Sequence, residues 1–171
     1  ADQMVTPVAP STGPVLLYHF DESNRVFVIA DSSGNGYDGD VSGSPVPFVS
    51  GGVSNNCIEF DGYMSVNAEP AALDTVTDAI TISFWVNGHA DQPLNDYLFD
   101  VADANSVPVN SIIMASVPWS EGNVIWGTTS ESSDWLRWLT QTESDFEGTW
   151  THYVMVKDVA IEHMRIYRNG E

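Results

Sequence analysis

Hydrophobic and polar residues alternate with a period of two through much of the chain. The clearest case is 79–87, where Ile, Ile, Phe and Val at the even positions are separated by Thr, Ser and Trp at the odd ones. Because successive side chains of a strand point to opposite faces of a sheet, this pattern predicts a strand with one buried face. Similar patterns predict further strands at 15–20, 26–30, 57–60, 63–67, 97–101, 111–117, 123–127, 135–140, 150–157 and 163–168.

Turn-forming residues separate these segments, and helical periodicity is almost absent. Asp61-Gly62 predicts a hairpin turn between 57–60 and 63–67. Pro45 and Pro47 indicate that 44–50 is an edge or loop segment. Only 69–79 is expected to hold a helical turn. Many short strands with regular turn signals predict an all-β, antiparallel two-sheet sandwich of the jelly-roll type.

The length of 171 residues fits one domain. Residues 1–14 contain three prolines and few large apolar groups, so we expect a tail or linker there and the domain at 15–171. The chain begins Ala-Asp-Gln, without an initiator Met, which fits either a processed secreted protein or a trimmed chain. We therefore expect an extracellular or cell-surface location.

The charge is strongly acidic, with 24 Asp and Glu against 5 Lys and Arg and a net charge of −19. This balance argues against nucleic acid and anionic membranes as partners, and it favours cations, neutral sugars or basic proteins. No apolar run is long enough for a membrane span, so membrane insertion is not expected. Cys57 is the single cysteine, which excludes an internal disulfide.

The segment 31–39 combines three glycines with oxygen-bearing side chains. Asp31, Ser33 and Asn35 alternate and Gly36 follows, which is the opening spacing of a calcium-binding loop. Ser42 stands where such a loop carries its bidentate acid, so this is not an EF-hand. A tight turn between strands explains the same composition, and both interpretations stay open.

Six short pieces of sequence, taken in order over 18–171, resemble the laminin-G-like group of concanavalin A-type jelly rolls, particularly the bacterial-type modules. The pieces are Tyr18-His19-Phe20-Asp21-Glu22, 31–36 with Gly39, 58–62, 81–86, 150–154 and 165–170. The resemblance implies two curved antiparallel sheets and a structural Ca²⁺, with Asp21, Asp31 and Asn35 as candidate ligands. It does not settle function, since this fold hosts lectins, adhesion modules, glycosidases and lyases.

Similar domains continue with further strands beyond the turn that corresponds to 167–170. The sequence stops at Glu171, so we expect either a fragment or a sheet completed by another chain. An unpaired sheet edge is a template for a strand from a neighbouring polypeptide. Self-assembly through the C-terminal edge is therefore one expected partner interaction.

Glu143, Asp145 and Glu147 have the spacing of the acidic strand in glycosidases of the laminarinase and agarase group. Alternation along a strand would place all three carboxylates on one face. Ser144 stands where that motif has an aliphatic residue, and 148–152 resembles a loop entering the next strand. Catalysis is therefore an alternative rather than the main prediction.

Tryptophans are the candidate ligand-binding residues, because sugars stack their C–H faces on aromatic rings. The candidates for glycan binding are Trp119, Trp126, Trp135 and Trp138. The competing interpretation is that their indoles fill the core, as is expected for Trp85 and Trp150. The histidines are scattered, and His19 and His152 are interpreted as packed or hydrogen-bonded residues.

These observations predict a secreted, calcium-stabilised and non-catalytic laminin-G-like module. It would bind a glycan or mediate adhesion to an extracellular protein. Two alternatives remain: a structural subunit of an extracellular filament or surface layer assembled by strand exchange, and a glycoside hydrolase or lyase that uses the 143–147 acids.

Overall fold

The structure is a computed structural model of the chain. The chain divides into two compact units, residues 1–75 and 76–171. It describes residues 13–23, 25–45, 47–92, 95–103, 110–119, 122–128, 134–139, 142 and 145–171. These residues form almost exclusively antiparallel β-structure, which confirms the predicted fold class. In the described residues, helical structure is limited to the 3₁₀ helix at Pro70–Leu73 and to 3₁₀ residues at 122, 134 and 145, and no helix there is long and apolar enough to cross a bilayer.

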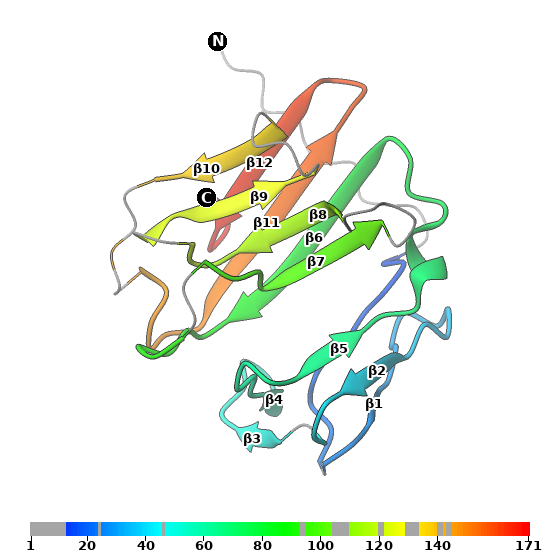
Figure 1. Cartoon of the computed structure of the whole chain (residues 1–171), viewed down its shortest axis with the longest axis vertical. Helices are drawn as coiled ribbons and strands as arrows, with labels where there is room; N and C mark the ends of the chain where they lie inside the picture. The colour runs from blue at the N-terminus through cyan, green and yellow to red at the C-terminus, as the bar shows by residue number, and fades with distance from the viewer. Residues whose placement is uncertain are drawn as a thin grey trace. The chain divides into compact units, whose positions relative to one another are not determined.

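The first unit contains two small sheets (Figure 1). One has the order β1-β2-β5, with β1 at Val28–Ile29, β2 at Gly39–Ser42 and β5 at Ser65–Asn67. The other pairs β3, Phe48–Ser50, with β4, Asn56–Ile58. The 3₁₀ helix η1, Pro70–Leu73, falls within the segment expected to hold a helical turn.

Gly39 allows close packing on β2. A Cβ at this position would lie 2.7 Å from Cγ1 of Val66 and 3.0 Å from the ring of Tyr18. Any larger residue would therefore push β5 or the Tyr18 ring away from the strand.

Two predictions for this unit are wrong. Residues 15–20 do not form a strand, and Tyr18 makes only an isolated bridge with Asp31. The hairpin predicted at Asp61-Gly62 does not form either, because β4 pairs with β3 and β5 pairs with β2. The turn that closes a hairpin lies at 51–55 instead, where Gly51 and Asn55 adopt positive φ and the Gly52 N–H donates to the Asn55 carbonyl.

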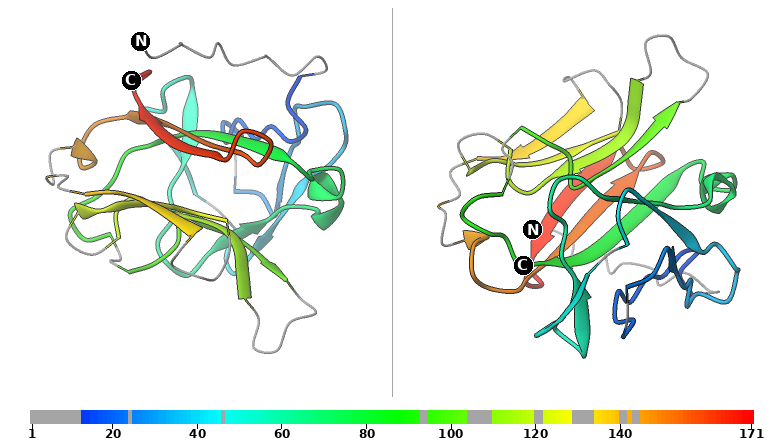
Figure 2. Two further views of the ribbon diagram at one scale, coloured as in Figure 1. Left: turned by 90° about the horizontal axis from the view of Figure 1, so that it is seen from above. Right: turned by 60° about the horizontal axis from the view of Figure 1, so that its bottom comes forward.

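The second unit is a two-sheet sandwich, whose sheets lie face to face in Figure 2. One sheet has the order β12-β11-β6, with β6 at Ala79–Val86, β11 at Thr151–Asp158 and β12 at His163–Arg168. The other has the order β10-β9-β8-β7, with β7 at Phe99–Asp103, β8 at Asn110–Ser116, β9 at Val124–Gly127 and β10 at Trp135–Trp138. These strands lie at or within a few residues of their predicted positions.

The core of this unit fills the space between the two sheets. The even-numbered side chains of β6 pack against it, as their alternation predicts. Trp126 is fully buried, and its Nε1 donates to the Val156 carbonyl at 3.1 Å, which ties β9 to β11. The Phe84 and Tyr153 rings stack within the same core. The opposite face of β12-β11-β6 is left for polar and partly exposed side chains.

Candidate functional site

The carboxylate of Asp31 organises the loop that follows β1. Its Oδ1 accepts hydrogen bonds from the backbone N–H groups of Leu17, at 3.0 Å, and Ser33, at 2.9 Å. Its Oδ2 accepts from the Ser33 hydroxyl, at 2.7 Å, and from the Tyr37 N–H, at 3.0 Å. Burial would raise the pKa of Asp31, but these hydrogen bonds outweigh it and hold the pKa well below its usual range.

This arrangement does not fit a calcium ion at Asp31. A carboxylate offers about four lone-pair sites, and four donors already occupy them. Asn35 directs its amide nitrogen to the Val15 carbonyl and the Ser33 hydroxyl, while Asp21 accepts from the Asn55 amide. In the described part of the chain, no three His, Cys, Asp or Glu side chains are grouped to hold a metal. Bound calcium thus stays a prediction that this geometry does not support.

The four predicted tryptophans do not form one surface. Trp126 is 0% exposed, so the glycan-stacking role predicted for it is incompatible with its place in the core. Trp135 packs over Gly127 with the Arg137 guanidinium 5.3 Å from its ring centre. Trp138 packs against the core under Arg168, which lies 5.1 Å from its ring centre.

Trp119 is partly exposed and belongs to a separate aromatic pair. Its ring stacks on Tyr97 with centroids 5.7 Å apart and planes inclined by 28°. Glycan contacts at Trp119, Trp135 and Trp138 stay predictions, whereas the burial of Trp126 excludes a contact there.

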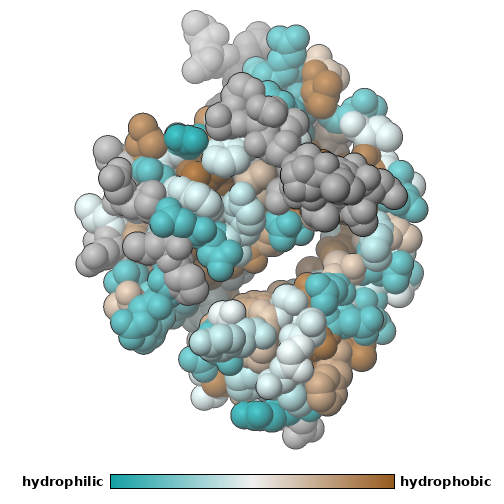
Figure 3. All heavy atoms as spheres, in the orientation of Figure 1, coloured by the Kyte–Doolittle hydropathy of each residue, from teal (hydrophilic) through white to brown (hydrophobic). Residues whose placement is uncertain are grey.

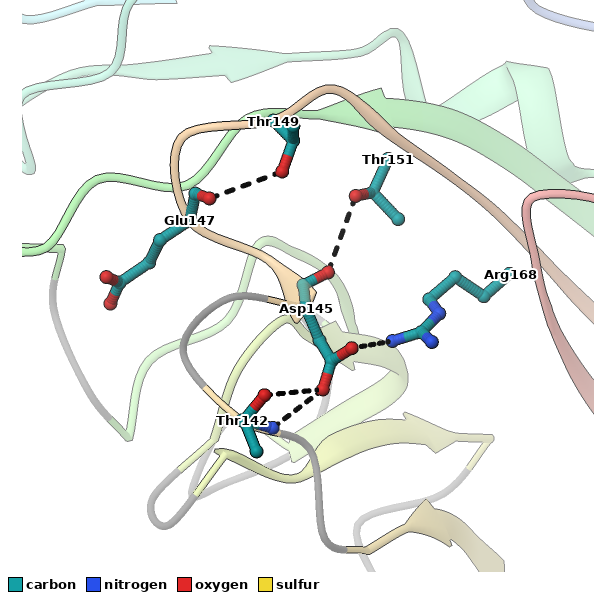
Figure 4. Close-up of polar contacts among 6 residues, drawn as sticks. All are labelled: Thr142, Asp145, Glu147, Thr149, Thr151 and Arg168. Atoms are coloured by element: carbon teal, nitrogen blue, oxygen red, sulfur yellow. Dashed lines mark hydrogen bonds and ion pairs between the residues drawn. The ribbon is translucent and has the colours of Figure 1, made fainter.

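In the described part of the acidic segment, residues 145–147, the strand that catalysis would need does not form. Glu143 lies outside the described residues, and 145–147 is a turn in which Phe146 is buried. Figure 4 shows the carboxylate of Asp145 directed at Thr142 and Arg168, while that of Glu147 points away from it. The two carboxylates are therefore not aimed at a common point.

Asp145 is held as a structural anion. It accepts hydrogen bonds from the Thr142 N–H, at 2.8 Å, and hydroxyl, at 3.0 Å, and it pairs with the Arg168 guanidinium at 2.9 Å. Hydrogen bonds from Thr142 first, and then from Arg168, lower the pKa of Asp145. The lowered pKa keeps the Asp145 carboxyl ionised, so Asp145 is not a general acid. The ion pair instead links Arg168 of β12 to Asp145, whose carboxylate is also bonded to Thr142.

A cluster that the sequence interpretation missed lies on the outer face of β12-β11-β6. Trp85 of β6 and His152 of β11 are cross-strand neighbours, and their rings stack with centroids 4.9 Å apart and planes inclined by 27°. Trp85 is 49% exposed, so the expectation that its indole fills the core is wrong. His152 Nε2 lies 2.8 Å from the Ser83 hydroxyl, and the His152 N–H donates to the Asn169 side chain at 3.0 Å.

This cluster places the exposed indole of Trp85 next to hydrogen-bonding groups of Ser83, His152 and Asn169. The signal for it was present in the alternation, because Trp85 occupies an odd, outward position of the segment 79–87. Its partner His152 could not be found in the same way, since the two residues are 67 positions apart in the sequence and meet only through the pairing of β6 with β11.

Comparison with known families supports the fold and covers this cluster. A family model described as Concanavalin A-like lectin/glucanases superfamily, of the laminin G type, matches residues 60–171. The match includes all strands of the second unit but not the Asp31 loop. Comparison with curated proteins gives no match, and neither does comparison with solved structures.

Proposed function

The chain belongs to the laminin G type of the concanavalin A-like lectin/glucanase superfamily, and on this premise we propose that it is a secreted, non-catalytic module that binds carbohydrate. The binding residues are Ser83, Trp85 and His152. The family supports carbohydrate binding or adhesion in general, and the outer-face cluster gives the proposal a specific location.

The observation that carries the proposal is the half-exposed indole of Trp85, backed by His152. An aromatic face packs well against the C–H face of a pyranose, and nearby hydroxyl and imidazole groups bond its hydroxyls. The hydrogen bonds of His152 to Ser83 and Asn169 hold these groups in place before a ligand arrives. Such preorganisation reduces the entropy lost on binding.

The direct test is a glycan array with the full chain, followed by calorimetry on the sugars that bind. We expect Trp85→Ala to weaken binding by about tenfold or more, because an aromatic contact contributes on the order of 1.5 kcal/mol beyond its buried area. Tyr63→Ala is the matched control, since Tyr63 is an aromatic residue of the first unit with 89% exposure. A chain that binds no sugar, or a Trp85→Ala variant that binds like the parent, would contradict the proposal.

The contact between Ser83 and His152 also resembles a nucleophile and its base. An acyl-transfer site needs oxyanion donors as well, but backbone N–H groups on paired strands are engaged in the sheet. Hydrolysis of p-nitrophenyl acetate measures this alternative. Turnover that disappears in Ser83→Ala would show that the cluster is catalytic.

Self-assembly is a second candidate function, because β12 lies at the edge of its described sheet. An edge strand offers unpaired backbone groups to another chain. Light scattering over a range of concentrations, with and without chelator, tests this candidate. Oligomers that grow with concentration would favour a filament or layer subunit, and a monomer at every concentration would contradict it.

A further inference from the structure

We infer that the sugar site continues from Trp85 across the sheet to Tyr167 on β12, so that the ligand is a linear oligosaccharide bound along its length. This inference rests on the proposed function and deepens it. It replaces a site for one terminal sugar with two aromatic subsites on the same face.

The strand register places both aromatic rings on one side of the sheet. Trp85 pairs with His152, and the next outward row contains Ser83, Val154 and Tyr167. Directly opposed residues of antiparallel strands point to the same face. Arg168 and Ile166, which flank Tyr167, point inward, where they contact Trp138 and the core.

The same register sets the separation of the two subsites. Tyr167 lies two strands and one outward row from Trp85, which corresponds to about 10 Å across the strands and about 7 Å along them. That span exceeds one pyranose ring. A single sugar stacked on Trp85 therefore cannot also cover Tyr167, whereas a chain of several sugars can.

The second subsite is fixed in place like the first. The Arg165 guanidinium donates to the Tyr167 hydroxyl at 3.0 Å, and a second nitrogen of the same group lies 3.3 Å from Nδ1 of His163. The phenol ring is thus held by a side chain of its own strand.

The path between the two rings crosses the middle strand, β11. The outward residues of β11 on this path are His152 and Val154, which are both partly buried. Ser83 is exposed and stands beside Val154 on β6, so its hydroxyl lies at the margin of the path. Aromatic residues at both ends of the path favour a ligand chain that is long enough to reach both.

The test is a length series of the oligosaccharide that the parent chain binds, measured by calorimetry. We expect affinity to rise by about tenfold between the disaccharide and the tetrasaccharide and then to level off, as the second ring becomes engaged. Tyr167→Ala should remove this gain while leaving disaccharide affinity unchanged. Trp85→Ala should weaken both ligands.

Two further variants keep the test interpretable. Tyr167→Phe retains the ring and should retain the gain with length, and melting curves confirm that each variant is folded. Tyr63→Ala serves again as the exposed aromatic control. Equal affinity for short and long ligands, or a Tyr167→Ala variant with the full gain, would overturn this inference and leave the proposed function intact. A parent chain that binds no glycan would overturn both.

Discussion

At the scale of the residue, the spacing Asp31-x-Ser33-x-Asn35-Gly36 suits either a cation or a turn closed on its own carboxylate. Both arrangements need oxygen-bearing side chains and glycines that bend the backbone. In the structure Gly34 and Gly36 adopt φ of 90° and 79°, and the loop directs N–H groups at Asp31. These donors stabilise the charged carboxylate of Asp31, and they hold the loop together without a metal.

The lowered pKa of Asp31 predicts acid sensitivity of the fold. Its stabilising effect is fully present above the unfolded pKa of about 3.9 and is lost as pH falls through the lower folded pKa. We expect Asp31→Asn to melt several degrees below the parent at pH 7, with a shallower decline below pH of about 4. Circular dichroism melts over this pH range measure both effects.

Asp74→Asn is the control for this variant, since Asp74 is an exposed residue after η1 and should melt like the parent. Chelator should leave all three chains unchanged. A parent whose melting temperature falls in chelator, with Asp31→Asn insensitive to it, would restore calcium at this loop.

At the scale of the element, individual strands were predictable but several of their partners were not. The alternation in β6 correctly separates core residues from outward ones, because side-chain direction in a strand is a local property. The pairing of β4 with β3 depends instead on the turn at 51–55, where Gly51-Gly52 signals a turn but does not say which strands it joins. Trp126 illustrates the same limit, since only the facing sheet makes it a core residue.

We predict that Trp126→Phe destabilises the fold without direct loss of sugar binding. The change leaves the Val156 carbonyl without its indole donor and opens space in the core, at a cost of about 1–3 kcal/mol. Urea unfolding measures this cost. Trp85→Phe is the converse control, because it should weaken binding while stability changes little. Binding that is lost in a folded Trp126→Phe variant would contradict the buried role of Trp126.

At the scale of the whole molecule, the net charge of −19 is the property that bears most on stability and on the choice of ligand. Hydrophilic and hydrophobic residues are mixed on the face shown in Figure 3. So large an excess of acids destabilises a compact chain by self-repulsion, and dissolved salt screens that repulsion. The same charge disfavours anionic ligands, in keeping with a sugar as the proposed partner.

Salt should therefore raise the melting temperature of the parent chain. We expect an increase of several degrees between low ionic strength and about 0.5 M NaCl, where the Debye length is a few ångströms. CaCl₂ and MgCl₂ at matched ionic strength should behave alike if the divalent ions act only by screening. A melting temperature that is independent of salt would contradict this account, and a gain peculiar to calcium would indicate a specific site.

By itself, the sequence determined the all-β class, the positions of the strands in the second unit and the family resemblance. These features depend on local alternation, turn residues and short motifs, all of which are present in neighbouring residues of the sequence. Only the tertiary structure decided which tryptophan is buried, that Asp31 is satisfied by N–H donors and that Trp85 meets His152. Each of these depends on groups brought together from elsewhere in the chain, and local pattern does not contain that information.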